Sequence, residues 1–326
     1  MDYSRILKRA FEITKKYPVL WFFGFFASAA WGGNFNARFP TGNMRWGRGE
    51  GILKGLEHGY GTLSHMLTLE AILAIAMLVL LFSLIYLVLR YVSLTALPRL
   101  VDEIESGRDR ISFSHGWKLG WSRRAWAVFG IEIVSFFVAV AVLVFVGGVL
   151  IALPLYFFIK HGHSSTVGIL LKMLPFGLSA LIILFVALIV ISLVTQFAQY
   201  HAAIEGEGVF QSFGWSIQAF KKRWSSIAMM WLIMVGVGIL LGLIVLIGIL
   251  VFGLVTLAIA GGIGWVLWKT VSEVLGVIVG ILVGLVTFVL PMFAVAAVVS
   301  TYKTTVWVLV YRELKEERSP ADLEPA

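Results

Sequence analysis

Long uninterrupted runs of apolar residues limit the fold of this chain more than any other feature of its sequence. Residues 173–200 and 225–260 contain no charged side chain. In hydrocarbon a chain must satisfy its backbone polar groups internally, and about 20 apolar residues in a helix cross a bilayer. Only 13% of the 326 residues are charged, about half the share in a soluble domain. The sequence therefore predicts an all-α, polytopic transmembrane helix bundle.

We expect six membrane-spanning helices. Their approximate bounds are 17–33, 68–97, 126–159, 173–200, 225–260 and 275–303. Several exceed the length that crosses a bilayer, so helices that tilt or continue past the lipid are expected. Residues 1–29 also resemble a cleavable signal peptide, because a basic start and an apolar run precede Ala27-Ser28-Ala29. These small residues suit helix packing equally well, so both interpretations stay open.

The distribution of basic residues predicts the orientation, since Lys and Arg favour the cytoplasmic side. Eighteen basic residues lie in the predicted inner segments 1–16, 98–125, 201–225 and 301–326, and seven lie in the outer segments. The net charge of +8 therefore fits contact with anionic lipid head groups. It does not indicate nucleic-acid binding, because no basic face belongs to a soluble fold. We expect a multi-pass protein of the cell (plasma) membrane with both termini in the cytoplasm.

One motif occurs twice between predicted spans. "GWKLGWSRRAW" (116–126) and "GWSIQAFKKRW" (214–224) each contain Gly-Trp, a basic pair and a second Trp. Tryptophan favours head-group depth because its ring is apolar and its N–H is polar. We expect amphipathic helices in the cytoplasmic interface, either as plain anchors or with a lipid-sensing or partner-docking role. The predicted interface anchors are Trp117, Trp126, Trp215 and Trp224.

The spacing of these motifs extends along the whole chain. A polar residue followed by Tyr ends each even-numbered span, and a basic pair precedes each odd-numbered one, at separations of 75, 76 and 80 residues. We expect a unit of one interfacial helix and two spans, used as parallel repeats within a single membrane domain. The approximate units are 1–97, 98–204 and 205–312, followed by a cytoplasmic tail, 313–326. The first unit matches loosely, so either two or three repeats remain open.

Few polar side chains lie inside the predicted spans, where they are costly unless paired or functional. The candidates are Arg90, Glu132, Gln196 and Gln199. Arg90 and Glu132 lie at a similar depth, about 10–12 Å into consecutive helices, so we predict an ion pair between them. This pair would serve as a packing clamp or as a substrate or proton site. Alternatively, Arg90 extends to the surface alone.

Glycines at intervals of four residues predict close helix packing. Gly238 and Gly242 have this spacing in the fifth span, and Gly276, Gly280 and Gly284 have it in the sixth. Small residues on one helix face let two backbones approach each other. Packing between these two spans and a homo-oligomer interface are the two interpretations.

Motifs of enzymatic chemistry are missing from the sequence, which has no cysteine and no GxxxxGK[ST], HExxH or GxSxG. Two sparse sets of candidate metal ligands lie in predicted outer loops: His161 with His163, and Glu57 with His58 and His65. Neither set has the clustered carboxylates that metal-assisted chemistry uses. We therefore expect no cofactor and no enzyme. The two function classes left are a structural or accessory protein and a small-solute transporter or channel with its path at the centre of the repeats.

The first 35 residues resemble a group of uncharacterised bacterial polytopic membrane proteins. The likeness is carried by Tyr3, Ile6, Arg9-Ala10-Phe11, Ile13-Thr14, Leu20-Trp21, Gly24 and Gly32-Gly33. More loosely, the six-span plan is similar to the membrane domain attached to some glycerophosphodiester phosphodiesterases. Only "KEERSPADLEPA" follows the last predicted span here, so we do not expect the activity of those enzymes. The resemblance implies no site residues.

Cysteine labelling tests the predicted topology, because the chain has no native cysteine. Asn43→Cys lies in the outer loop 32–67, whereas Ser114→Cys and Ala326→Cys lie in inner segments. We expect an impermeant maleimide to label only Asn43→Cys in intact cells, and the other two variants in inside-out vesicles. Labelling of Ser114→Cys in intact cells would show that the six-span topology is wrong.

Overall fold

The computed structural model describes residues 1–28, 69–108, 110–160 and 166–316, and this part of the chain is helical, which confirms the predicted fold class. Its elements are α1 (Tyr3–Lys16), α2 (Val19–Ser28), α4 (Leu69–Glu105), α5 (Phe113–Gly120), α6 (Arg123–Lys160), α7 (Thr166–Glu205), α8 (Val209–Thr270) and α9 (Glu273–Glu316). Among these, α4, α6, α7, α8 and α9 are long and apolar enough to cross a membrane.

The long helices extend beyond the predicted spans. The last five predicted spans correspond to long helices, and the first, 17–33, is described only as far as Ser28 at the end of α2. α8 has 62 residues because the second Gly-Trp segment continues into the following span, with a kink at Arg223 (φ −134°, ψ 34°). α4 and α9 run on to Glu105 and Glu316, so charged turns follow their apolar parts.

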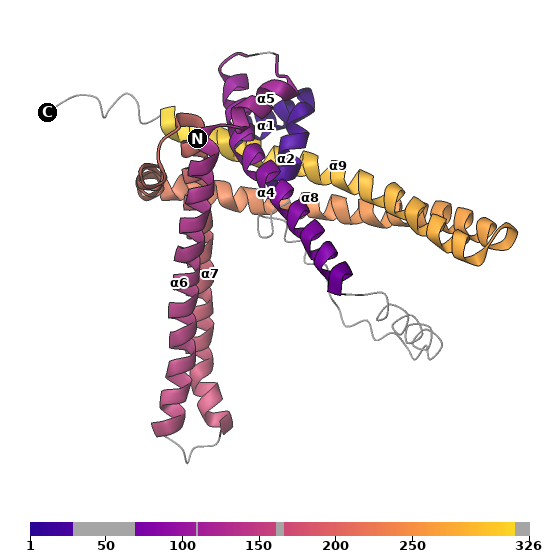
Figure 1. Cartoon of the computed structure of the whole chain (residues 1–326). Helices are drawn as coiled ribbons and strands as arrows, with labels where there is room; N and C mark the ends of the chain where they lie inside the picture. The colour runs from indigo at the N-terminus through magenta and orange to yellow at the C-terminus, as the bar shows by residue number, and fades with distance from the viewer. Residues whose placement is uncertain (29–68, 109, 161–165, 317–326) are drawn as a thin grey trace.

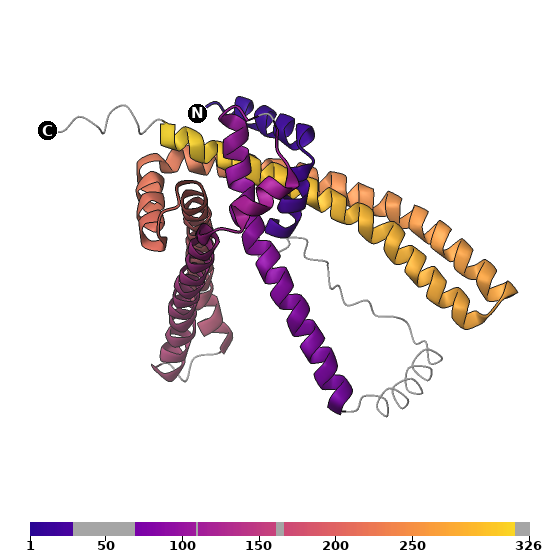
Figure 2. The same ribbon diagram turned by 45° about the horizontal axis from the view of Figure 1, so that its top comes forward.

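The long helices of the described chain form three arms that leave a common junction in different directions (Figures 1 and 2). α6 packs along α7 as one hairpin, α8 packs along α9 as another, and α4 is the third arm. We call the junction the hub and define it by the described residues of 1–28, 91–135, 193–234 and 297–316. Large apolar side chains are exposed along the arms, as expected for helices that face lipid.

The hub contains the hydrophobic core. Phe23 of α2, Leu100 of α4 and Phe197 of α7 are fully buried there. α2 approaches α9 closely: a Cβ added to Gly24 would lie 2.0 Å from Oγ1 of Thr301. Because α2 packs against both α4 and α9, the N-terminal residues form part of the core.

The hairpin of α8 and α9 packs through small residues far from the hub. A Cβ added to Gly276 would lie 2.6 Å from the carbonyl oxygen of Gly264, and one added to Gly280 would lie 3.3 Å from that of Ala260. A Cβ added to Gly284 would lie 3.4 Å from Cβ of Ala260. The predicted contact of the last two spans through these α9 glycines is present, and its α8 side is formed by Ala260 and Gly264.

Gly238 and Gly242 do not take part in this intrachain packing, so a homo-oligomer interface is the interpretation that stays open for these two glycines. A Cβ added to either glycine would meet no atom of the described chain within 4 Å. The reason lies in the course of α8: Met230 and Met234 are its last buried side chains in the hub, and the helix then enters the arm. The four-residue spacing gives these two glycines a common helix face, but no other helix of the described chain contacts it closely.

Valine at Gly276 tests the close approach. Its Cβ would overlap backbone atoms of Gly264 and Trp268, which cannot rotate away as a side chain could. We expect Gly276→Val to lower the stability of the purified protein by about 1–3 kcal/mol. The measurement is the midpoint of thermal unfolding in detergent. Gly238→Val is the matched control because its side chain would enter open space, and equal losses in both variants would contradict the assignment.

Candidate functional site

The predicted ion pair between α4 and α6 is present. Nη2 of Arg90 donates to Oε1 of Glu132, and the hydroxyl of Tyr91 donates to Oε2 of the same carboxylate at 2.8 Å. That hydroxyl also accepts a hydrogen bond from Nη1 of Arg90 at 3.3 Å. The side chains of Arg90 and Glu132 are 18% and 31% exposed, so each charge meets its partner where little solvent reaches. The three residues join the arm of α4 to the first turns of α6.

The other polar candidates lie on α7 and have separate contacts. Gln196 donates from Nε2 to the hydroxyl of Tyr200 at 2.7 Å, one turn along the same helix. Gln199 is partly buried. The hydroxyls of Thr195 and Ser135 lie 2.7 Å apart and link α7 to α6. The structure therefore brings Arg90 and Glu132 together and leaves Gln196 bonded within its own helix.

The two Gly-Trp segments differ in their surroundings. In α5 the ring of Trp117 stacks on that of Trp121, with centroids 6.2 Å apart. Trp126 and Trp224, which follow the two basic pairs, are 73% and 64% exposed. Trp215 instead lies parallel to the imidazole of His201, with ring centroids 4.7 Å apart. Its position against the hub differs from the predicted head-group position.

Trp215 packs inward because of the helix face on which it lies. Ser212, Ser216 and Ala219 of the same segment are buried, so this side of the first part of α8 contacts the hub. The neighbouring Phe220 is also packed against the hub core. The exposed Trp224 comes after this segment, beyond the kink at Arg223.

The basic pair of the first motif, Arg123-Arg124, is divided between two environments. Arg123 is exposed, whereas Nη1 of Arg124 donates to the carbonyl oxygens of Ala203 and Ile204 at 3.0 and 2.6 Å. These carbonyls belong to the last turn of α7, which lacks intrahelical partners. Gly206 accommodates this arginine with φ of 82°, and a Cβ there would lie 2.8 Å from Nε of Arg124. Arg124 therefore acts as a cap for α7.

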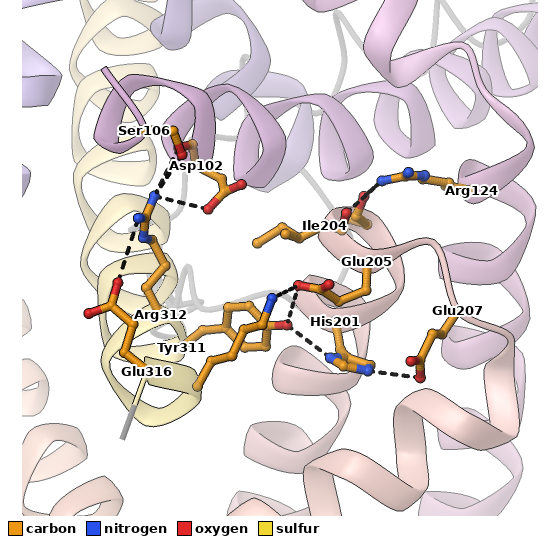
Figure 3. Close-up of polar contacts among 12 residues, drawn as sticks. Asp102, Ser106, Arg124, His201, Ile204, Glu205, Glu207, Tyr311, Arg312 and Glu316 are labelled. Carbon is orange, nitrogen blue, oxygen red and sulfur yellow. Dashed lines mark hydrogen bonds and ion pairs between the residues drawn. The ribbon is translucent and has the colours of Figure 1, made fainter. Parts of the chain in front are cut away.

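A polar cluster inside the hub was not predicted from the sequence (Figure 3). His201 of α7 is 4% exposed, and its Nδ1 lies 2.8 Å from the hydroxyl of Tyr311 on α9. Its Nε2 lies 2.9 Å from Oε2 of Glu207, just beyond the end of α7. The Tyr311 hydroxyl is also 3.4 Å from Oε1 of Glu205, and that oxygen accepts a hydrogen bond from Lys315 at 2.5 Å. We call these five residues the His201 cluster.

Charged contacts also join other helices at the hub. Nη1 of Arg312 on α9 donates to the backbone oxygen and to Oδ1 of Asp102 on α4, at 2.9 and 3.0 Å. Arg9 of α1 donates to Oε1 of Glu105 at 2.7 Å, and this bond raises the pKa of the Arg9 guanidinium. The amino terminus lies 3.7 Å from Oε1 of Glu313, so both ends of the described chain meet in the hub.

The metal-ligand candidates predicted in the outer loops lie outside the described residues. These are His161, His163, Glu57, His58 and His65, together with the loop 32–67. In the part of the chain that the structure describes, no three His, Asp or Glu side chains are grouped as metal ligands.

Arms with exposed apolar surfaces and a hub with charged contacts define a polytopic, helical membrane protein. Residues 15–319 match a family of unknown function (DUF7544), and the chain belongs to this family. Membership agrees with the resemblance of the opening residues to an uncharacterised group of membrane proteins. Comparison with curated proteins and with solved structures gives no match.

A charge swap tests the clamp between α4 and α6. Arg90→Glu or Glu132→Arg alone would place two like charges together where little solvent reaches, a cost of about 3 kcal/mol for a buried pair and less at partial exposure. We expect each single variant to lower the yield of monodisperse protein in size-exclusion chromatography and the double variant to recover most of it. Tyr91→Phe keeps both charges and removes only the hydroxyl that donates to Glu132. We expect this control to lose less yield than either single charge variant. A double variant no better than the single ones would show that the two charges do not stabilise each other.

Proposed function

We propose that this chain is a structural or accessory protein of the cell membrane, without enzymatic activity or a cofactor. In this proposal the three arms lie in the bilayer, and the hub, which contains both ends of the described chain, lies at the cytoplasmic surface. The bias of basic residues toward the segments that form the hub supports this orientation. A membrane-embedded protein partner or a second copy of the chain would bind between the arms.

The packing at the point where the arms meet carries the proposal. Ala96, Leu97, Phe197 and Ile227 are at most 1% exposed, and they come from three of the helices that converge there. A transport path needs polar groups around a cavity that admits water. The point where these helices converge is instead filled by apolar side chains, and the arms diverge from it (Figure 2). Their apolar faces are therefore directed toward lipid or toward other helices.

Exposed aromatic and basic side chains support a place for the hub at head-group depth. Trp121, Trp126 and Trp224 are among the exposed large side chains, and Arg123 and Lys221 are exposed close to them in sequence. Tryptophan rings and basic side chains together favour the boundary between acyl chains and anionic head groups. The partner of this surface would be the cytoplasmic leaflet.

The second candidate function is a small-solute transporter or channel. The Arg90–Glu132 pair favours it, because charged residues inside spans often mark a solute or proton path. The order of elements favours it as well. α5, α6 and α7 give a short helix followed by two long ones, and the two parts of α8 followed by α9 repeat this order. Parallel repeats of this kind surround the path in some transporters.

Labelling of a cysteine at the centre of the hub distinguishes the two functions. Ala96 is fully buried, and Ala96→Cys adds little volume. We expect a small, water-soluble thiol reagent to leave this variant unmodified in membranes and to modify it after denaturation, since the accessory function predicts a dry centre. Ser114→Cys, on the exposed surface of α5, is the control for reagent access from the cytoplasmic side. Rapid modification of Ala96→Cys in native membranes would favour the transporter.

A further inference from the structure

His201 contacts three other parts of the hub at once, and Figure 3 shows two of these contacts. Its imidazole faces the hydroxyl of Tyr311 on α9 through Nδ1 and the carboxylate of Glu207 through Nε2. One ring face lies against Trp215 in the first part of α8, with the two rings 9° from parallel. The side chain therefore joins the end of α7, which belongs to one arm, to the start of α8 and to α9, which belong to another.

The neutral state of the cluster follows from the number of available protons. A neutral imidazole carries one N–H. An ionised Glu207 can only accept, so the contact at Nε2 requires the proton to be on Nε2. Nδ1 must then accept, and the Tyr311 hydroxyl donates its single proton to Nδ1 at 2.8 Å. In this state that hydroxyl has no proton to offer to Glu205.

The protonated state reverses one of these hydrogen bonds. Imidazolium carries an N–H on both ring nitrogens, so Nδ1 donates to the oxygen of Tyr311. The Tyr311 hydroxyl is then free to donate to Oε1 of Glu205, which lies 3.4 Å away and would move closer. One proton is taken up from water at Nδ1, and no covalent bond of the protein breaks. The change adds a hydrogen bond between α9 and the end of α7.

The charged side chains around His201 allow its imidazole to take up this proton. Glu205 has Lys315 as its partner at 2.5 Å, and Asp102 on α4 has Arg312 at 3.0 Å. Glu207, whose side chain is 47% exposed, faces His201 itself. Each nearby carboxylate other than Glu207 is thus balanced by a basic side chain from α9. An imidazolium would balance Glu207 in the same way.

We propose that His201 is a proton-operated switch that moves the hydrogen bond of the Tyr311 hydroxyl from His201 to Glu205. Histidine is the side chain whose ordinary titration falls between pH 5 and 8, so a change in the acidity of the solution around the hub would operate the switch. Protonation would fasten the end of α7 to α9 and tighten the link between the two helical hairpins. This proposal does not depend on whether the arms support a partner or surround a solute path.

Fluorescence of the full-length protein in detergent tests the protonation step. Imidazolium quenches a stacked indole more strongly than neutral imidazole does, because it accepts an electron from the excited ring. We expect the emission of wild type minus that of Trp215→Phe to fall between pH 8 and pH 5 in a single transition. His201→Gln should abolish this transition. His115→Gln, at a separate contact with Glu103, should retain it. A transition that persists in His201→Gln, or none in wild type, would overturn the proposal.

Backbone hydrogen exchange tests the transfer of the Tyr311 hydrogen bond. After correction for the intrinsic effect of pH, we expect residues 201–208 of wild type to exchange more slowly at pH 5.5 than at pH 8. Tyr311→Phe should lose this difference and keep the fluorescence transition, because it lacks the hydroxyl and keeps the imidazole. An unchanged exchange difference in Tyr311→Phe would overturn the switch.

A third variant covers the case in which His201→Gln fails to fold. Glu207→Gln removes the carboxylate at Nε2 from a half-exposed side chain and should fold. We expect the midpoint of its fluorescence transition to fall by about 0.5–1 pH unit, since an opposite charge nearby favours the charged imidazole. A midpoint equal to that of wild type would overturn the assignment of the transition to His201.

Discussion

Directional polar contacts at the hub help to fix the directions of the arms of this protein, because apolar surfaces alone do not select one helix arrangement inside a membrane. An apolar helix surface is about as stable against lipid as against another apolar helix, so hydrophobicity alone does not orient membrane helices. The structure places its directional interactions where the arms converge: Arg312 with Asp102, Arg124 with the end of α7, and the His201 cluster. Each of these contacts joins two different helices.

The polar contacts also explain the shape of the core. Buried apolar side chains are concentrated in the hub, where helix ends with unpaired carbonyls and charged turns come together. Arg124 satisfies the carbonyls of Ala203 and Ile204, so the end of α7 packs in the hub without leaving these two groups unpaired. Farther along the arms, contacts depend on small residues such as Gly264 and Gly276, where two backbones meet directly. The hub is therefore joined by directional hydrogen bonds and ion pairs, whereas α8 and α9 are joined by close contacts between their backbones.

Two contacts predicted from positions in the sequence, one between charged residues and one between glycine faces, differ in the structure. Arg90 and Glu132 were predicted to meet because consecutive helices are usually neighbours and both residues lie at the same depth, and the contact is present. Gly238 and Gly242 had the same four-residue spacing as the α9 glycines but face open space. Spacing identifies a face on one helix. It does not identify what lies opposite that face.

The amino-acid sequence alone determined the class of the protein: apolar runs without charge can only form helices in lipid, and this led to the long helices and to their order. The sequence also predicted the pairing of Arg90 with Glu132, which are 42 residues apart on neighbouring helices. Only the tertiary structure decided the His201 cluster, since His201 and Tyr311 are separated by 110 residues and lie on different hairpins. Their meeting depends on how the two hairpins cross at the hub, and that geometry is set by the packing of many side chains at once.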